Sequence, residues 1–356
     1  MSSKDVRHDK ACEQTFKSQT FLFLRSEKPH TDFRLALAYE LKQLGHHVTY
    51  IYVQKRPMRV DVANPSDQHH MSLIAFMIMI LRTFAWRTDV VVFNSTNLTF
   101  PVLSLCLRCV LWGTWCFDLH DNLLYNTQGF KRIKGRMSLW MLGRISRFTL
   151  CASPLLTELV PQALHLGNAS NLVRKVREKL TVNRVLVLSS LDERFDFELF
   201  EGVAQDNPAI TFVIRGHISG ANPLYQERLN ALLNKNSNIS YEGAYVNDDI
   251  ADLLHNYHLT FAPYVTSSQF TRYIDPLRFH HCLRSGLEII TTHIPACEEW
   301  QDRIHIIEKI SDFSILIKSL TLGDLPLRNG LGCQESPSWR NRALQLDNLL
   351  KNGRMI

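Results

Sequence analysis

The sequence predicts an α/β protein of two domains, each built on a doubly wound and largely parallel sheet. Short, continuously apolar runs alternate with segments of helical apolar spacing, the pattern of strands buried on both faces. The alternation lapses into small, polar and basic residues at about 165–183 and then restarts. A chain of 356 residues also exceeds what one hydrophobic core usually serves.

The first domain opens on a strand at 20–24 and a helix that ends near Gly45. Further elements are expected as strands at 47–53, 88–95, 110–121 and 148–153, and as helices at 72–86, near 100–109 and at 130–146. The strand at 110–121 carries Asp118, His120 and Asp121 at its carboxyl end. Since ligands bind at the carboxyl ends of parallel strands, these residues mark the ligand side of the first sheet.

The second domain repeats the pattern. Strands are expected at 184–190, 209–216, 239–243, 258–264 and 305–309, and helices at 196–205, 224–235 and 247–257, the last capped by Asn247 or Asp248. The stretch 275–295, DPLRFHHCLRSGLEIITTHIP, reads as a helix, a Ser285-Gly286 turn and a strand. The expected units are an N-terminal domain at 1–165, a linker at 166–183, a C-terminal domain at 184–335 and a closing helix at 336–356.

Composition and charge narrow the class of protein. The net charge of +6 suits an anionic ligand or membrane surface, but it does not indicate nucleic acid, for which no motif appears. The first 17 residues lack the apolar core of a signal peptide, which predicts a cytoplasmic protein. The eight cysteines lie mostly in apolar segments, as buried, reduced thiols do, and the CxxC at 106–109 has no second pair to form a metal site.

Two apolar stretches, 72–86 and 101–117, are each interrupted by an arginine and fall short of a transmembrane span. They predict a buried helix, and a helix followed by a strand. In an alternative interpretation the first helix lies against a membrane surface. The residues that would face the membrane are Phe76, Met77, Met79, Ile80 and Trp86.

Four segments carry a family resemblance. A series of strand ends and helix starts is matched by the first two segments. These are LDERFDFELF followed by ITFVIRGH, and then ISYEGAYVNDDIADLLHNYHLTFAPY. DPLRFHHCLRSGLEIITTHIP matches a donor-site pattern, P-L-K-x-x-E-y-l-A-x-G-x-P-V-V-x-T, and SWRNRAL matches a closing helix. Together they resemble nucleotide-sugar-dependent glycosyltransferases of the GT-B type, over 184–350 above all. The resemblance implies two Rossmann-like domains that face a cleft.

Within that group the chain is most similar to bacterial exopolysaccharide transferases such as the glucuronosyltransferase of xanthan assembly. There an aspartate after a strand near the end of the first domain is the proposed base, and Asp121 stands at that position here. The chain departs from the pattern where Arg278 replaces a lysine, His281 a glutamate and Ser189 a glycine. RSEKPHTD also takes the place of a glycine-rich loop after the first strand.

The resemblance implies that the helix beginning near residue 275 receives the donor diphosphate. Arg278 lies in its first turn, where a guanidinium and the positive helix end would both face a phosphate. His281 lies one turn further on, Arg215 ends a strand, and two tyrosines on loops would contact the base or the sugar. The expected donor contacts are Arg278, His281, Arg215, Gly216, Tyr245, Tyr264, Asp275, Pro276, Phe279 and Ser189. Alternatively, Arg278 pairs with an exposed acid and the histidines merely coat the helix.

The missing carboxylates favour inversion. Many retaining relatives carry two glutamates eight residues apart, and Tyr273 and His281 occupy those positions here. An inverting enzyme needs a general base in the first domain, and Asp121 is the first candidate. Asp118 or His120 could act in its place, and Asp121 could instead be a turn aspartate.

Acceptor contacts are expected at the first strand-helix junction, from His30, Thr31 and Arg34. A plain helix cap by Thr31 or Asp32 explains the same residues. The sequence therefore predicts an inverting glycosyltransferase that uses a nucleoside-diphosphate sugar as co-substrate, with UDP favoured, and neither cofactor nor metal. Its acceptor would be a lipid-linked or polysaccharide chain at the inner face of a bacterial cell membrane. The alternatives are a nucleotide-sugar epimerase and a catalytically inactive scaffold subunit of the same fold.

Overall fold

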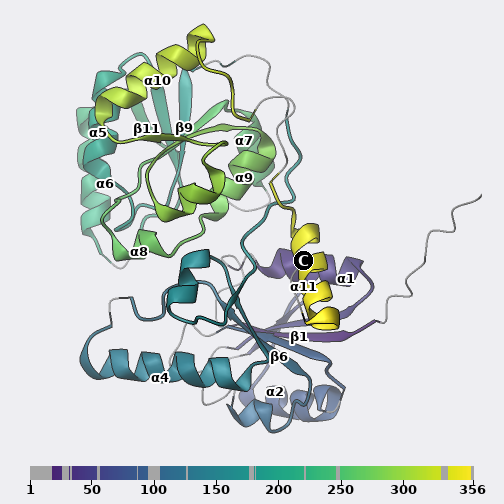
Figure 1. Ribbon diagram of the computed structural model, residues 1–356. Helices are drawn as coiled ribbons and strands as arrows, with labels where there is room; N and C mark the ends of the chain where they lie inside the picture. The colour runs from purple at the N-terminus through teal and green to yellow at the C-terminus, as the bar shows by residue number, and fades with distance from the viewer. Residues whose placement is uncertain are drawn as a thin grey trace, which may run out of the picture.

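The computed structural model describes residues 18–25, 32, 34–53, 57–85, 87–94, 105–125, 127–175, 180, 182–219, 222–245, 249–329 and 336–353. Figure 1 shows two sheets in separate bodies, one above the other, each flanked by helices. The predicted α/β class with two doubly wound sheets is confirmed.

The first sheet runs in the order β4-β3-β2-β1-β5-β6-β7-β8. Its strands are β1 (Thr20–Arg25), β2 (His47–Tyr52), β3 (Met58–Val60), β4 (Gln68–His70), β5 (Val90–Phe93), β6 (Thr114–Leu119), β7 (Phe148–Cys151) and β8 (Leu164–His165). From β2 to β8 all neighbours pair in parallel, whereas β3 and β4 add an antiparallel hairpin at one edge.

The second sheet runs in the order β11-β10-β9-β12-β13-β14, entirely parallel. Its strands are β9 (Arg184–Leu188), β10 (Thr211–Arg215), β11 (Ile239–Tyr241), β12 (Leu259–Ala262), β13 (Glu288–Thr292) and β14 (His305–Ile307). This is the Rossmann order, which reverses between β9 and β12. A ligand is expected outside the carboxyl ends of the strands next to that reversal.

Helices cover both faces of each sheet. In the first domain they are α1 (Arg34–Gln43), α2 (Leu73–Met79), the π-helix η2 (Ile80–Phe84), α4 (Gly129–Ile145) and the 3₁₀-helix η3 (Pro154–Glu158). In the second they are α5 (Phe197–Asp206), α6 (Leu224–Lys235), α7 (Ile250–His255), α8 (Gln269–Arg272), α9 (Leu277–Ser285), the 3₁₀-helix η5 (Pro295–Trp300) and α10 (Ile310–Leu322), followed by α11 (Trp339–Asn352). The apolar side chains of α2, η2 and α4 share one core with the first sheet, and those of α1 and α11 share the core on its other face.

The last helix and the linker tie the halves together. Helix α11 follows the second domain in sequence but lies beside α1 of the first (Figure 1). In the linker, the backbone N–H of Asn168 donates to the Asp275 carboxylate at 2.6 Å, and its side-chain amide donates to the Asp275 carbonyl at 2.7 Å.

Four local expectations need correction or fall outside the description. Residues 58–70 were expected as a loop and form the β3–β4 hairpin. The helix expected at 72–86 is α2 continued by a π-turn, and its Phe76 and Ile80 lie in the core rather than against a membrane. Of the helix expected near 100–109, residues 105–109 are described, and 105–108 form one helical turn. The cap residues Asn247 and Asp248, and Trp86, lie outside the described residues.

Candidate functional site

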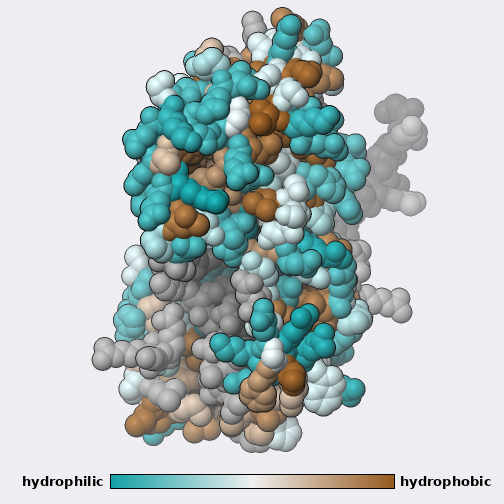
Figure 2. Space-filling model, turned by 90° about the vertical axis from the view of Figure 1, so that its left-hand side faces the viewer, coloured by the Kyte–Doolittle hydropathy of each residue, from teal (hydrophilic) through white to brown (hydrophobic). Residues whose placement is uncertain are grey.

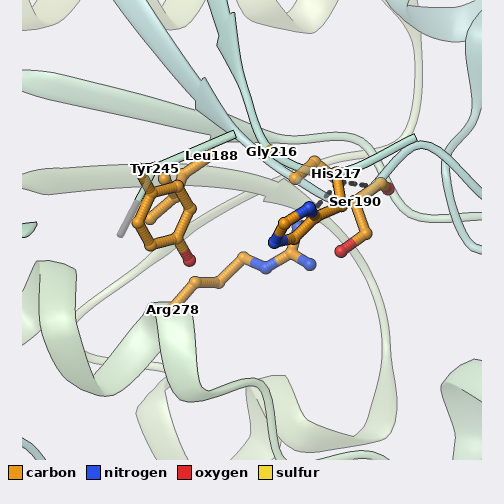
Figure 3. Close-up of a pocket in the computed structure, with 7 residues that line it drawn as sticks. Leu188, Ser190, Gly216, His217, Tyr245 and Arg278 are labelled. Atoms are coloured by element: carbon orange, nitrogen blue, oxygen red, sulfur yellow. Dashed lines mark hydrogen bonds between the residues drawn. The ribbon is translucent and has the colours of Figure 1, made fainter. Parts of the chain in front are cut away.

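A pocket lies at the carboxyl ends of β9 and β10, beside the point where the strand order reverses. Its walls come from two strand ends, the segment after β11 and the start of α9. The lining residues are Leu188, Ser189, Ser190, Gly216, His217, Tyr245 and Arg278. Figure 3 shows the side chains of Tyr245, Arg278 and His217 converging from these different elements.

Gly216 allows β9 and β10 to end close together. A Cβ atom at this position would meet the Ser189 carbonyl oxygen at 1.9 Å, a separation that no relaxed structure tolerates. The backbone N–H of Ser189 donates to the Arg215 carbonyl at 3.0 Å, so the two strand ends stay paired up to the pocket. Glycine is therefore the residue that lets this wall form.

Arg278 supplies the positive charge of the pocket. Its Nη1 donates to Ser189 Oγ at 2.8 Å, and its guanidinium lies 5.2 Å from the centre of the Tyr264 ring. It is the second residue of α9, so it lies in the first turn, where the backbone N–H groups have no partner within the helix. Among the described residues no acid pairs with Arg278, so the alternative of a simple surface ion pair finds no partner here.

The two predicted tyrosines play different parts. Tyr245 lines the pocket, and burial raises the pKa of its hydroxyl although the charge of Arg278 opposes that rise. Tyr264 is buried beneath Arg278, and its ring meets the ring of Phe279 edge-on at 6.1 Å. Tyr245 can thus touch a ligand directly, whereas Tyr264 supports the guanidinium.

Sequence reasoning missed three residues of the pocket, Leu188, Ser190 and His217. Ser190 and His217 directly follow two predicted residues, Ser189 and Gly216, and Leu188 directly precedes Ser189. The signal was present in the sequence, because all three lie within two residues of the carboxyl end of a predicted strand, 184–190 or 209–216.

Several expected donor contacts lie away from the pocket. Arg215 turns toward Glu242, with 3.4 Å between Nη1 and Oε2. His281 Nδ1 lies 2.8 Å from Ser170 Oγ in the linker, and burial, with the charge of His280, lowers the pKa of His281 to about 4. The structure does not bring the Arg215 guanidinium or the His281 imidazole to the same place as Arg278.

The residues around the start of α9 are structural. Asp275 accepts hydrogen bonds from the linker, and its Oδ1 lies 2.7 Å from His280 Nε2. Pro276 caps α9, and Phe279 is buried in the core. We correct the expectation that Asp275 and Phe279 contact the donor, because their side chains are engaged or enclosed by protein.

In the first domain, Asp118 and His120 belong to a buried charged network. Asp118 accepts hydrogen bonds from Arg25 Nη1 at 2.8 Å and Arg34 Nη2 at 3.2 Å, and its Oδ2 lies 2.6 Å from His120 Nε2. Burial alone would raise the pKa of Asp118, but the charges of Arg34 and His120 hold it well below its usual value. Asp32, at the start of α1, joins the network through Arg25.

This network changes the interpretation of the acceptor residues. Arg34 is fully buried, and it also donates to the Leu166 carbonyl at 2.7 Å. Its expected contact with an acceptor is therefore replaced by a structural role. His30 and Thr31 lie outside the described residues.

Asp121 lies at the surface just after β6, where the domains approach each other. Burial would lower the pKa of Arg194 in the second domain, but hydrogen bonding to Asp192 and nearby negative charge raise it. The carboxylate of Asp121 is one of these negative charges. Beside it, the rings of Tyr125 and Phe270 meet across the domains at 4.8 Å. Of the three candidate bases, Asp121 is the one whose carboxylate is exposed on this side.

Within the described ranges, no group of three His, Cys, Asp or Glu side chains is arranged to hold a metal ion. No helix in the described part of the chain has the length and apolar character needed to cross a membrane.

Comparison with known proteins supports the fold. No protein-family model matches the sequence, and no curated protein matches it. Among solved structures, HepE of Anabaena in complex with UDP and glucose is similar with a TM-score of 0.60 and 12% identity, over 93% of this chain and 95% of HepE. Sucrose-phosphate synthase from Thermosynechococcus elongatus has a TM-score of 0.62 at 12% identity, again over 93% and 95%.

A third similar structure, named for UDP-N-acetylglucosamine 2-epimerase activity, comes from Listeria monocytogenes. It has a TM-score of 0.58 and 11% identity, over 95% of this chain and 97% of that one. At such identities the similarity establishes the fold. The chain therefore has the two Rossmann-like domains of the GT-B arrangement.

Proposed function

We propose that the chain is a glycosyltransferase that takes a sugar from a nucleoside-diphosphate sugar, with UDP favoured. One observation carries the proposal. Arg278 stands in the first turn of α9 at a pocket at the strand ends, held by Ser189 and Tyr264 and with no acidic partner among the described residues.

This geometry suits a leaving diphosphate. As the bond to the sugar breaks, negative charge grows on the diphosphate, and a fixed guanidinium beside a helix N-terminus stabilises that charge. Charge-assisted hydrogen bonds of this kind need no metal ion, and metal independence is part of the proposal. Tyr245 and His217 line the same pocket as Arg278, and a base, ribose or sugar would lie against them.

The finer features of the proposal rest on the sequence resemblance. They are transfer with inversion, Asp121 as general base, and a lipid-linked or polysaccharide acceptor in bacterial surface polysaccharide synthesis, of the xanthan type. The exposure of Asp121 where the domains meet supports the choice of base. A cytoplasmic enzyme at the inner face of the cell membrane fits that acceptor. UDP is favoured because HepE was solved with UDP.

The first test is a calorimetric titration with UDP, GDP and CMP. We expect one nucleotide to bind, and Arg278→Ala to weaken binding by about 10-fold to 100-fold, since hydrogen bonds to charged groups contribute about 1.5–3 kcal/mol. Arg215→Ala is the matched control and should bind as the wild type does, because Arg215 turns toward Glu242. If the wild type binds none of the three nucleotides, the transferase proposal fails.

The Listeria structure favours one second candidate, a nucleotide-sugar epimerase that acts on the donor alone. Proton NMR distinguishes the two activities. An epimerase converts UDP-N-acetylglucosamine into its 2-epimer without an acceptor, and a transferase leaves that configuration unchanged.

A further inference from the structure

Helix α4 carries an apolar stripe on the face turned away from the protein. Its exposed members are Phe130 (79% exposed), Ile133 (57%), Met137 (66%) and Trp140 (66%). Spacings of three, four and three residues place them on one side of an α-helix. Leu139 and Leu142 are buried against the sheet from the opposite side. The core therefore uses only one of the two apolar faces of α4.

Cations surround this stripe. Helix α4 contains no acidic residue, and its basic residues are Lys131, Arg132, Lys134, Arg136 and Arg144. By helical geometry Lys134 and Arg136 flank the stripe on either side. The Arg144 guanidinium lies over the Trp140 ring, 5.4 Å from its centre. An apolar stripe bordered by lysine and arginine is the composition of a helix that lies in a lipid interface.

The neighbouring helix extends the surface. On α2 and η2, which pack on the same face of the first sheet, Ile74, Ile78 and Leu81 are exposed. Figure 1 shows α2 and α4 along the lower side of the first domain, and Figure 2 shows brown and tan groups at that end of the molecule. Exposed apolar side chains thus gather on one helical layer of the N-terminal domain.

We propose that this face of α4, with the exposed residues of α2 and η2 beside it, docks on an anionic lipid surface. The stripe would insert among the acyl chains near the headgroups, and the cations would meet anionic headgroups. A second copy of the chain is a poor occupant, because it would bring two helices of five cations and no acid face to face. The proposal extends the membrane contact of the proposed function, but it does not require that the chain bind a nucleotide.

The position of α4 gives this docking a consequence for the site. Asp121 and the start of α4 at Gly129 are joined by a single short loop. Tyr125 on that loop contacts Phe270 of the second domain. A lipid surface under α4 would therefore hold a membrane-embedded acceptor near the side of the molecule where Asp121 lies.

The test is co-sedimentation of the full chain with vesicles. We compare pure phosphatidylcholine with a mixture that contains phosphatidylglycerol, at low and high salt. We expect binding to the anionic vesicles, weakened by salt. Ile133→Glu/Trp140→Glu, and separately Lys134→Ala/Arg136→Ala, should each reduce partition by about tenfold or more, given about fivefold per cation at an anionic surface.

The control is Ile315→Glu/Leu322→Glu, two side chains of similar exposure on α10 of the second domain. It should sediment as the wild type does. Equal binding by all variants, or no binding of the wild type to either vesicle, would overturn the proposal. So would self-association in ultracentrifugation that only the α4 variants lose, which would identify a protein interface. A UDP titration of the same variants keeps failure of lipid binding separate from failure of the donor site.

Discussion

At the scale of single residues, Gly216 offers the sharpest test of the pocket wall. In Gly216→Ala the added methyl group meets the Ser189 carbonyl, so the strand ends must separate. We expect a loss of about 1–3 kcal/mol in the free energy of unfolding and nucleotide affinity at least about tenfold weaker. Gly143→Ala in α4, where the methyl group meets only the flexible Gln162 side chain, should cost no stability. Unchanged calorimetric affinity in Gly216→Ala would contradict the close approach.

His281 makes a prediction about pH. Burial and the charge of His280 lower its folded-state pKa to about 4, below the unfolded value of 6.5. Between these two pH values the unfolded chain therefore binds more protons than the folded chain. The contribution of His281 to the free energy of unfolding is complete above pH 6.5 and is lost as the pH falls toward 4. In His281→Gln the fall in the free energy of unfolding from pH 7.5 to pH 4.5 should be smaller than in the wild type by about 2–3 kcal/mol. Urea unfolding at pH 4.5 and at pH 7.5 measures this difference for both proteins.

The control for this prediction is His69→Gln, which changes an exposed histidine beside Asp67. It should leave the difference between pH 4.5 and pH 7.5 as in the wild type. If His281→Gln shows the full wild-type decline, His281 is not the group that titrates.

Residue positions were predictable where they followed from strand ends, and unpredictable where they depended on packing. Arg278, Ser189, Gly216 and Tyr245 line one pocket because parallel strands end at a common edge. The same logic did not show that Arg34 would be buried. Its enclosure depends on Asp118 and on the linker carbonyls, which are distant in sequence.

At the scale of elements, the charged network holds β1, β6 and α1 together. Asp118 on β6 bonds Arg25 on β1 and Arg34 on α1, all within the protein interior. In Asp118→Asn two buried guanidiniums lose a counter-charge, which should reduce the free energy of unfolding by about 3–5 kcal/mol. Asp61→Asn, at an exposed pair with Lys42, should change it by about 1 kcal/mol or less. Equal effects of the two substitutions, measured by denaturant unfolding, would show that the network is not stabilising.

Helices and strands were predictable where their apolar residues follow a clear pattern, and not where that pattern is missing. The parallel strands are continuous apolar runs, and the sequence indicates nearly all of them. The β3–β4 hairpin escaped prediction because β4 is fully exposed, with the sequence Gln68-His69-His70 and no buried face. The exposed stripe on α4 escaped for a related reason: apolar residues at helical spacing predict a core face, and α4 has two such faces.

At the scale of the whole molecule, the chain crosses between domains twice, and the two crossings lie together. The backbone N–H of Ser170 in the linker donates to the Pro337 carbonyl just before α11, at 3.2 Å. Asn171 accepts from the N–H of Trp339 and donates to Glu40 on α1. Helix α11 is thus packed into the N-terminal domain, so the stability of that domain depends on residues more than 300 positions away from β1.

Trp339→Ala tests this dependence. The indole is buried beside Arg34, whose guanidinium lies 5.7 Å from its centre, in the core shared by α1 and the first sheet. Removing this indole should reduce the free energy of unfolding by about 3–5 kcal/mol. Trp140→Ala, which removes an exposed indole from α4, should cost almost nothing. In Trp339→Ala the backbone amides of α1 and of β2 in the first sheet should lose protection from hydrogen exchange. The amides of β9 and β10 in the second sheet should keep theirs. An equal loss in both sheets would mean that α11 stabilises the two domains as one unit instead of completing the first.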